Sequence, residues 1–178
     1  MKTVLSLILI GAGSRLITLP HGLSLTVAMI LLAAAYLDWR RTIIVALGTM
    51  ILGDTLTGFH SMIPWTWTGV VLMAQVAWTL FRGKITYPRM AMVSIVSLTV
   101  YHLWSNFGIW VMGSCLPEER VYPMTLAGLT AVYQAGWSYY LYSIGGNLAI
   151  TTAAFIVAKK TFGLSAVRSQ KAEAVVKI

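Results

Sequence analysis

One aspartate stands apart from every other charged residue of this chain. Asp54 is the only acidic residue inside any long apolar run, and it lies near the end of the run at residues 42–59. An ionised carboxylate in an apolar environment is costly unless a partner or water compensates its charge. Asp54 therefore has two interpretations: it belongs to a functional site, or it pairs with Arg15 and holds two helices together.

Several other polar residues occur in or beside apolar segments and could line a pocket with Asp54. On the topology derived below they all fall toward one side, where a small-molecule site between helices is expected. The alternative is that these groups form hydrogen bonds between helices and have no ligand. The candidate ligand-pocket residues are Arg15, His21, Asp54, His60, Asn106 and Asn147.

The sequence predicts no metal, no cofactor and no catalysis. His21 and His60 with Asp54 form a conceivable ligand set for a divalent ion, but no pair has the close helical spacing of a dedicated site. His102 is the one histidine placed for haem or chlorin ligation. The sequence has no G-x-S-x-G, no H-E-x-x-H and no glycine-rich phosphate loop, which are the common catalytic signatures.

The composition places these residues in a membrane protein. Apolar residues make up 58% of the 178 residues and charged residues only 10%, against roughly 25% charged in an average soluble domain. The net charge of +8 is better explained by basic cytoplasmic loops than by binding of nucleic acid. The single cysteine, Cys115, excludes an internal disulfide.

Seven apolar segments follow one another, and none alternates as a membrane β-strand does. A spanning helix needs about 20 apolar residues, and unpaired backbone groups cannot face lipid. The sequence therefore predicts an all-α integral membrane protein. The segments cover residues 3–19, 23–37, 42–59, 64–81, 90–113, 124–140 and 141–158.

Charge asymmetry favours six crossings. With a cytoplasmic amino terminus and six spans, eleven of the thirteen basic residues lie inside, and only Arg15 and Arg120 lie outside. Residues 124–140 are rich in tyrosine and tryptophan, which prefer the water–lipid boundary. We predict six transmembrane helices plus one interfacial or re-entrant outer helix at 124–140, with both termini cytoplasmic. The alternative is one long helix broken near Gly145 and Gly146.

Residues 1–162 are predicted to form a single transmembrane helical domain, and residues 163–178 a polar cytoplasmic tail. The first fourteen residues resemble a signal peptide, with Lys2 before a short apolar stretch. We expect them to be retained as the first helix of the mature protein.

Five motifs occur in an order that resembles a known family. They are RLxxxPH at 15–21, GDTLTGFHSMIP at 53–64, SNFGIW at 105–110, YPMTLAGLTAVYQA at 122–135 and GGN at 145–147. Over roughly residues 10–160 the chain resembles a family of small uncharacterised bacterial membrane proteins similar to the substrate-binding S components of energy-coupling-factor (ECF) transporters.

The resemblance implies an S-component-like bundle of six helices in the bacterial cytoplasmic (inner) membrane, with a ligand pocket facing outward. An S component captures a vitamin-like molecule and works with a transmembrane coupling subunit and two ATPases. Two positions depart from the family pattern. Residues 23–26 read LSLT in place of an Asn-Phe-Thr-Pro-like segment, and Asn147 stands where an acidic residue is usual.

Two functions follow from these observations. The first is binding of a small molecule from the outer side for uptake, with a coupling subunit and ATPases as partners. The second is a non-catalytic accessory or structural subunit of a larger membrane complex, photosynthetic or respiratory, whose other subunits are the partners. Both place the protein in the lipid bilayer, and neither involves nucleic acid.

Overall fold

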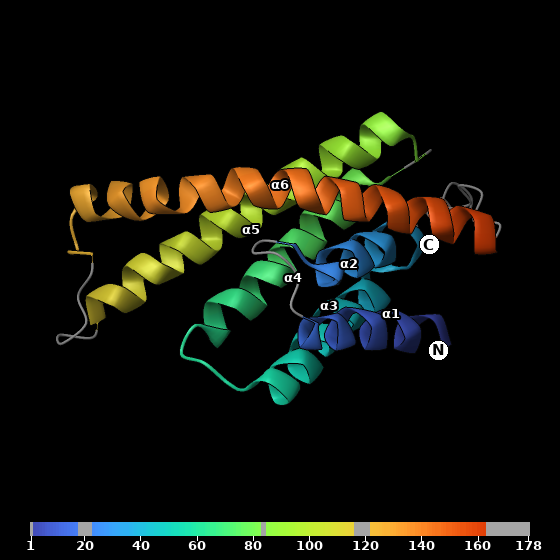
Figure 1. Cartoon of the computed structure of the whole chain (residues 1–178), viewed down its shortest axis with the longest axis horizontal. Coiled ribbons are helices and arrows are strands. Elements are labelled where there is room, and N and C mark those ends of the chain that lie inside the picture. Colours follow the sequence, from blue (N-terminus) through green and yellow to red (C-terminus); the bar gives the residue numbers. More distant parts are fainter. Residues whose placement is uncertain (1, 18–22, 83–84, 116–121, 163–178) are drawn as a thin grey trace, which may run out of the picture.

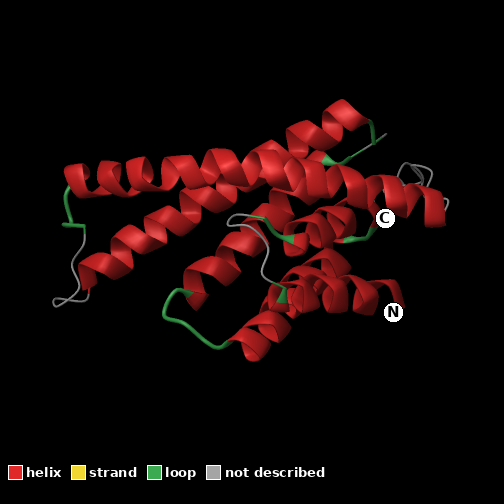
Figure 2. Cartoon of the chain, in the orientation of Figure 1, coloured by secondary structure: helices red, strands yellow, loops and turns green. Residues whose placement is uncertain are grey.

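The part of the chain that the structure describes is helical and has no strand. The computed structural model describes residues 2–17, 23–82, 85–115 and 122–162, and its helices are shown in Figure 2. The predicted all-α class is confirmed. The elements are α1 (Lys2–Gly13), η1 (Ser14–Leu16, a 3-10 helix), α2 (Leu25–Tyr36), α3 (Trp39–Thr57), α4 (Ile63–Leu80), α5 (Tyr87–Cys115) and α6 (Leu126–Phe162).

Helix α2 is the centre of the bundle. It contacts α1, α3, α4 and α6, and nine of its twelve residues are buried. A helix that is apolar on all sides is stable only where other elements surround it. Ala33, Ala34 and Ala35 are completely buried, and their small side chains let the neighbouring helices approach closely.

Local signals set the ends of the helices near the site. The Ser24 hydroxyl accepts a hydrogen bond from Thr26 N and caps α2, and Asp38 caps α3 by accepting one from Arg41 N. Helix α3 ends at Gly58, whose φ of 104° lies in a region that glycine adopts without strain. The loop after Gly58 then leads into α4, which has Pro64 in its first turn.

Successive helices alternate in direction (Figure 1). The starts of α1, α3 and α5 and the ends of α2, α4 and α6 therefore lie at one end of the bundle. At the opposite end, which we call the far end, α5 and α6 extend beyond the other helices. We name the first end the basic end because these helix termini carry Lys2, Arg40, Arg41, Arg82, Arg89, Lys159 and Lys160.

The separate outer helix predicted at 124–140 is wrong. That segment joins 141–158 in the single helix α6, which runs without a break, so the alternative of a break near Gly145 and Gly146 is wrong as well. A Cβ at Gly145 would meet no atom within 4 Å, whereas the Leu23 side chain packs against Gly146. The cost of two helical glycines, about 1 kcal/mol each, does not outweigh the packing of α6 along α5 and α2.

Length and composition single out α6 as a candidate membrane span. Its 37 residues correspond to about 56 Å, whereas α1 and α2, with 12 residues each, are about 18 Å long. Within the described ranges only α6 is both long and apolar enough to cross a membrane. These criteria support one of the six predicted spans. The predicted tail at 163–178 lies outside the described residues.

Enlarging a side chain at the centre of the bundle should destabilise the fold. Ala28 of α2 is completely buried in a cluster that includes Phe81 and Phe155. Ala28→Leu should lower the free energy of unfolding by about 1–3 kcal/mol because overpacking forces its neighbours apart. Thermal unfolding of the purified protein measures the effect. Ala153→Leu, at an exposed position of α6, is the control, and equal stability of the two variants would contradict the central position of α2.

Candidate functional site

A cavity of about 560 Å³ lies among the helices, and its lining residues come from η1, α2, α3, α4, α5, α6 and the segments just before α2 and just after α3. Small-molecule sites in proteins have volumes of roughly 300–1,000 Å³, so this cavity is large enough for a drug-sized ligand. Its lining combines aromatic rings, thioethers and hydrogen-bonding groups. The aromatic, thioether and polar lining residues are Tyr101, Tyr139, Tyr140, His60, His102, Met50, Met62, Met73, Arg15, Ser24, Thr26, Thr66, Ser105, Asn106, Ser143 and Asn147.

The fold brings together most of the residues that the sequence predicted for the site. Arg15, His60, Asn106 and Asn147 all line the cavity, although they come from distant parts of the chain. Asp54 does not line the cavity itself but lies beside two lining residues, Arg15 and His60. His21 lies outside the described residues.

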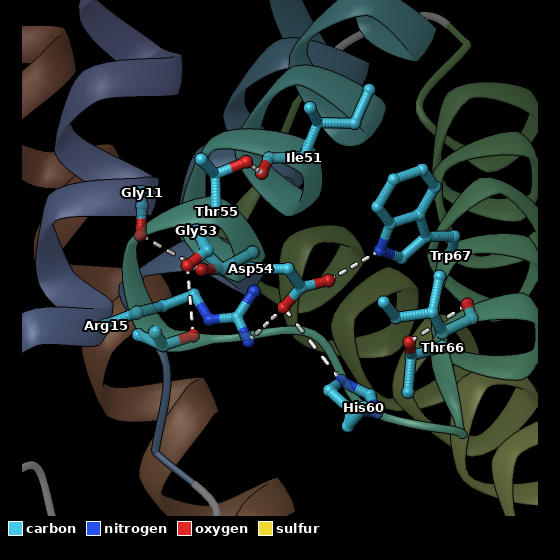
Figure 3. Close-up of polar contacts among 12 residues, drawn as sticks. Gly11, Arg15, Ile51, Gly53, Asp54, Thr55, His60, Thr66 and Trp67 are labelled. Carbon is cyan, nitrogen blue, oxygen red and sulfur yellow. Dashed lines mark hydrogen bonds and ion pairs between the residues drawn. The ribbon is translucent and has the colours of Figure 1, made fainter.

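The Asp54 carboxylate is completely buried, and its two oxygens have different partners (Figure 3). Oδ1 forms an ion pair with Arg15 Nη2 at 2.5 Å, and Oδ2 accepts a hydrogen bond of 2.6 Å from Trp67 Nε1. His60 Nε2 lies 3.9 Å from Oδ1, and its side chain is 41% exposed. One carboxylate thus links η1, α3, the loop after α3 and α4.

Arg15 reaches Asp54 by crossing directly over Gly53. A Cβ at Gly53 would lie 2.6 Å from Arg15 Cδ and 2.7 Å from Arg15 Nη1. The short helix η1 places Arg15 in this position, and the Ser14 hydroxyl fixes the turn by donating to the carbonyl of Gly11 at 2.7 Å. Glycine at position 53 is therefore required for the ion pair, since any larger side chain would occupy the path of the arginine.

The α5 wall of the cavity is built around His102 and Asn106, which lie one helical turn apart. Asn106 Nδ2 donates to the carbonyl of His102 at 2.9 Å and lies 3.1 Å from His102 Nδ1. The His102 ring stacks on Tyr140 of α6, with ring centroids 4.5 Å apart. Gly136 allows this close approach of α6, because a Cβ there would lie 2.7 Å from Asn106 Oδ1.

Asn147 makes hydrogen bonds that join helices. Its Oδ1 accepts from Ser24 N at 3.2 Å, and its Nδ2 donates to the carbonyl and the hydroxyl of Ser143 at 2.8 and 3.0 Å. These contacts tie α6 to the residue that caps α2. Asn147 therefore acts as a link between helices, which was the alternative to a role in ligand binding. Its side chain also borders the cavity.

Several lining residues were missed from the sequence. The sequence pattern suggests His102 only as a ligand of haem or a chlorin, and it assigns Tyr139 and Tyr140 to the water–lipid boundary. One signal was available: His102 and Asn106 are four residues apart and so share one face of a helix. The packing of that face against α6 has no counterpart in the sequence pattern.

The predicted absence of a metal site remains a prediction. In the described ranges no three His, Cys, Asp or Glu side chains converge. Of the set considered above, Asp54 already contacts Arg15 and Trp67, His60 Nε2 lies 3.9 Å from it, and His21 lies outside the described residues.

Residues 1–168 match the family described as "Family of unknown function (DUF6580)". The chain belongs to this family. No curated protein and no solved structure matches this chain. Membership agrees with the expectation of an uncharacterised family, whereas the match shows no link to the S components of ECF transporters.

Replacing Gly53 should break the ion pair between Arg15 and Asp54. In Gly53→Ala the arginine has to leave its path along α3, and we expect a loss of roughly 1–3 kcal/mol in unfolding free energy. Gly145→Ala is the matched control, since nothing lies within 4 Å of its Cβ. Alanine there should stabilise α6 by up to about 1 kcal/mol. Thermal unfolding of both variants tests the contrast, and equal shifts would contradict the close approach of Arg15.

Neutralising Asp54 should destabilise the protein, whereas neutralising an exposed aspartate should not. Asp54→Asn leaves Arg15 without its carboxylate, and removing one member of a buried pair typically costs 3–5 kcal/mol. We expect about 3 kcal/mol, the low end of that range, because the Arg15 side chain is 24% exposed.

Asp38→Asn is the control because asparagine caps a helix as well as aspartate does. Its pair with Arg41 is exposed on both sides, so denaturant unfolding should show a change below about 0.5 kcal/mol. A change of similar size in both variants would mean that Asp54 is compensated by water rather than by Arg15.

Proposed function

We propose that this protein is an S-component-like integral membrane protein that binds a small organic molecule in its cavity for uptake. The observation that carries the proposal is the 560 Å³ cavity, lined by hydrogen-bonding and aromatic groups inside a bundle whose outer surface is apolar. Binding in this role needs no catalysis by the protein itself.

The distribution of polarity supports a membrane environment. Large apolar side chains are exposed on α1, α3, α4, α5 and α6, including Leu5, Ile44, Leu72, Ile95 and Val157. Polar side chains are buried inside, among them Thr42, Thr49, Ser94 and Ser97. Apolar surface of this extent is typical of contact with lipid or with another protein.

The arrangement of charge supports an orientation. The seven basic residues that define the basic end lie opposite the end of the bundle where α1 and α3 finish (Figure 1), and Arg15 follows α1 in η1 while Asp54 lies in the last turn of α3. Basic residues collect on the cytoplasmic side of membrane proteins. We therefore place the basic end in the cytoplasm of a bacterial inner membrane, with the start of α1 and the end of α6 on that side. A coupling subunit and ATPases would act there.

A second candidate function is that of an accessory subunit in a larger membrane complex. Helix α6 extends beyond the bundle at its start (Figure 1), where Leu126 is 75% exposed. Trp137 and Tyr142, further along α6, are more than half exposed, and these exposed side chains favour the accessory role. In this alternative the exposed faces of α5 and α6 contact helices of other subunits.

Native mass spectrometry of the protein purified in mild detergent separates the two functions. Binding for uptake predicts a co-purifying small molecule that is lost when the cavity is filled by Ser105→Phe. Ser138→Phe, at an exposed position of α6, should keep it. A protein that carries no small molecule and co-purifies with a fixed set of membrane subunits would support the accessory role and contradict the proposal.

A further inference from the structure

We propose that the cavity selects a planar, uncharged heterocycle that carries a lactam edge, an N–H beside a C=O, and that His102 and Asn106 bind this edge together. The inference rests on the proposed function and names the class of ligand at that same site. Four observations carry it: the orientation of one amide, the tautomer of one imidazole, the charge balance and the aromatic lining.

The orientation of the Asn106 amide follows from its contact with a backbone carbonyl. The atom of Asn106 that lies 2.9 Å from the His102 carbonyl has to be Nδ2, because a carbonyl oxygen only accepts hydrogen bonds. The same Nδ2 lies 3.1 Å from His102 Nδ1 and donates its second hydrogen there. The other amide atom, Oδ1, is then an acceptor.

The tautomer of His102 follows from the same contacts. Since Nδ1 accepts from Asn106, the proton of the neutral imidazole is assigned to Nε2. This tautomer cannot bind a metal through Nε2, but it can donate a hydrogen bond. Within the described ranges neither His102 Nε2 nor Asn106 Oδ1 has a hydrogen-bond partner, and both residues line the cavity.

One donor and one acceptor on adjacent turns of α5 match a lactam edge. The C=O of the ligand would accept from His102 Nε2, and the N–H of the ligand would donate to Asn106 Oδ1. A polar group that a ligand covers without giving it a hydrogen bond costs about 1–3 kcal/mol, so these two groups favour a ligand that satisfies both. A hydrocarbon of the same shape would leave both unpaired.

The wall is rigid before any ligand binds. The Thr99 hydroxyl donates to the carbonyl of Ile95 at 2.7 Å, so the Tyr140 hydroxyl, 2.7 Å from the same oxygen, donates to it. Tyr140 is thus held in place, and its ring in turn holds the stacked ring of His102. Preorganised groups of this kind cost little entropy on binding.

Charge and shape complete the class of ligand. The Arg15 guanidinium at the cavity wall is balanced by Asp54 at 2.5 Å, so an uncharged ligand leaves this pair undisturbed. Tyr101 and Tyr139 add aromatic rings to the lining, and Met50, Met62 and Met73 add thioethers, which contact aromatic rings favourably. A flat heterocycle uses all of these surfaces.

The test compares two probes that differ in one hydrogen-bond donor. Isocarbostyril is a planar bicyclic lactam, and N-methylisocarbostyril has the same ring system without the N–H. Isothermal titration calorimetry of the full chain in detergent should show affinity for isocarbostyril about tenfold higher than for its methyl derivative. This comparison on the wild-type protein requires no variant to fold.

Variants assign the preference to the wall. His102→Phe keeps a ring on Tyr140 but removes the Nε2 donor, and it should weaken isocarbostyril binding about tenfold. Tyr133→Phe is the control, because the Tyr133 hydroxyl bonds to the carbonyl of Leu103 and does not line the cavity. It should leave both affinities unchanged.

The outcomes separate this inference from the proposed function. Equal affinity of the wild type for both probes would overturn lactam recognition while showing that the cavity takes organic ligands. No binding of either probe would also overturn it, and the co-purification experiment would then decide the proposed function independently. A tenfold preference that persists in His102→Phe would place the lactam elsewhere and overturn the assignment to this wall.

Discussion

A carboxylate with no exposed surface has to be compensated where it lies, and much of this bundle is arranged around that requirement. Asp54 receives Arg15 on one oxygen and Trp67 on the other. Each contact constrains another part of the chain: Gly53 has to lack a side chain so that Arg15 can cross α3, and Gly58 turns the chain so that His60 lies beside the pair. The end of α1, the end of α3 and the start of α4 are thus held together by one charge.

Some buried hydroxyls elsewhere in the bundle are satisfied within a single helix. The hydroxyls of Thr49 and Ser94 donate to the carbonyls four residues earlier at 2.7 and 2.8 Å. This local bonding lets small polar residues occupy the interior without a partner on another helix. Four other side chains cannot be satisfied in this way, because each has more than one hydrogen-bonding atom and a single backbone carbonyl can pair with only one of them. They are Asp54, His102, Asn106 and Asn147. They have partners on other helices or they border the cavity.

Two asparagines on neighbouring helices show how the same side chain serves two purposes. Asn147 uses both ends of its amide, one on the backbone of Ser24 and one on Ser143, and so joins α2 to α6. Within the part of the chain that the structure describes, Asn106 forms hydrogen bonds only through its Nδ2, to His102 one turn earlier in α5. Its Oδ1 faces Gly136 beside the cavity. The first is a link between helices, and the second belongs to the lactam-binding wall that we propose.

The sequence by itself determined the helical class, the apolar character of the chain, the collection of basic residues at alternate helix ends, and the exceptional position of Asp54. These properties depend on composition and on local spacing, which are known from the linear sequence without the fold. It offered Arg15 as the partner of Asp54 only as one of two alternatives. The tertiary structure decided between a broken and a continuous α6, because packing against α5 and Leu23 outweighs the local preference of two glycines. It also decided which polar residues meet, since the contact of His102 with Tyr140 depends on the register of two helices that no local pattern specifies.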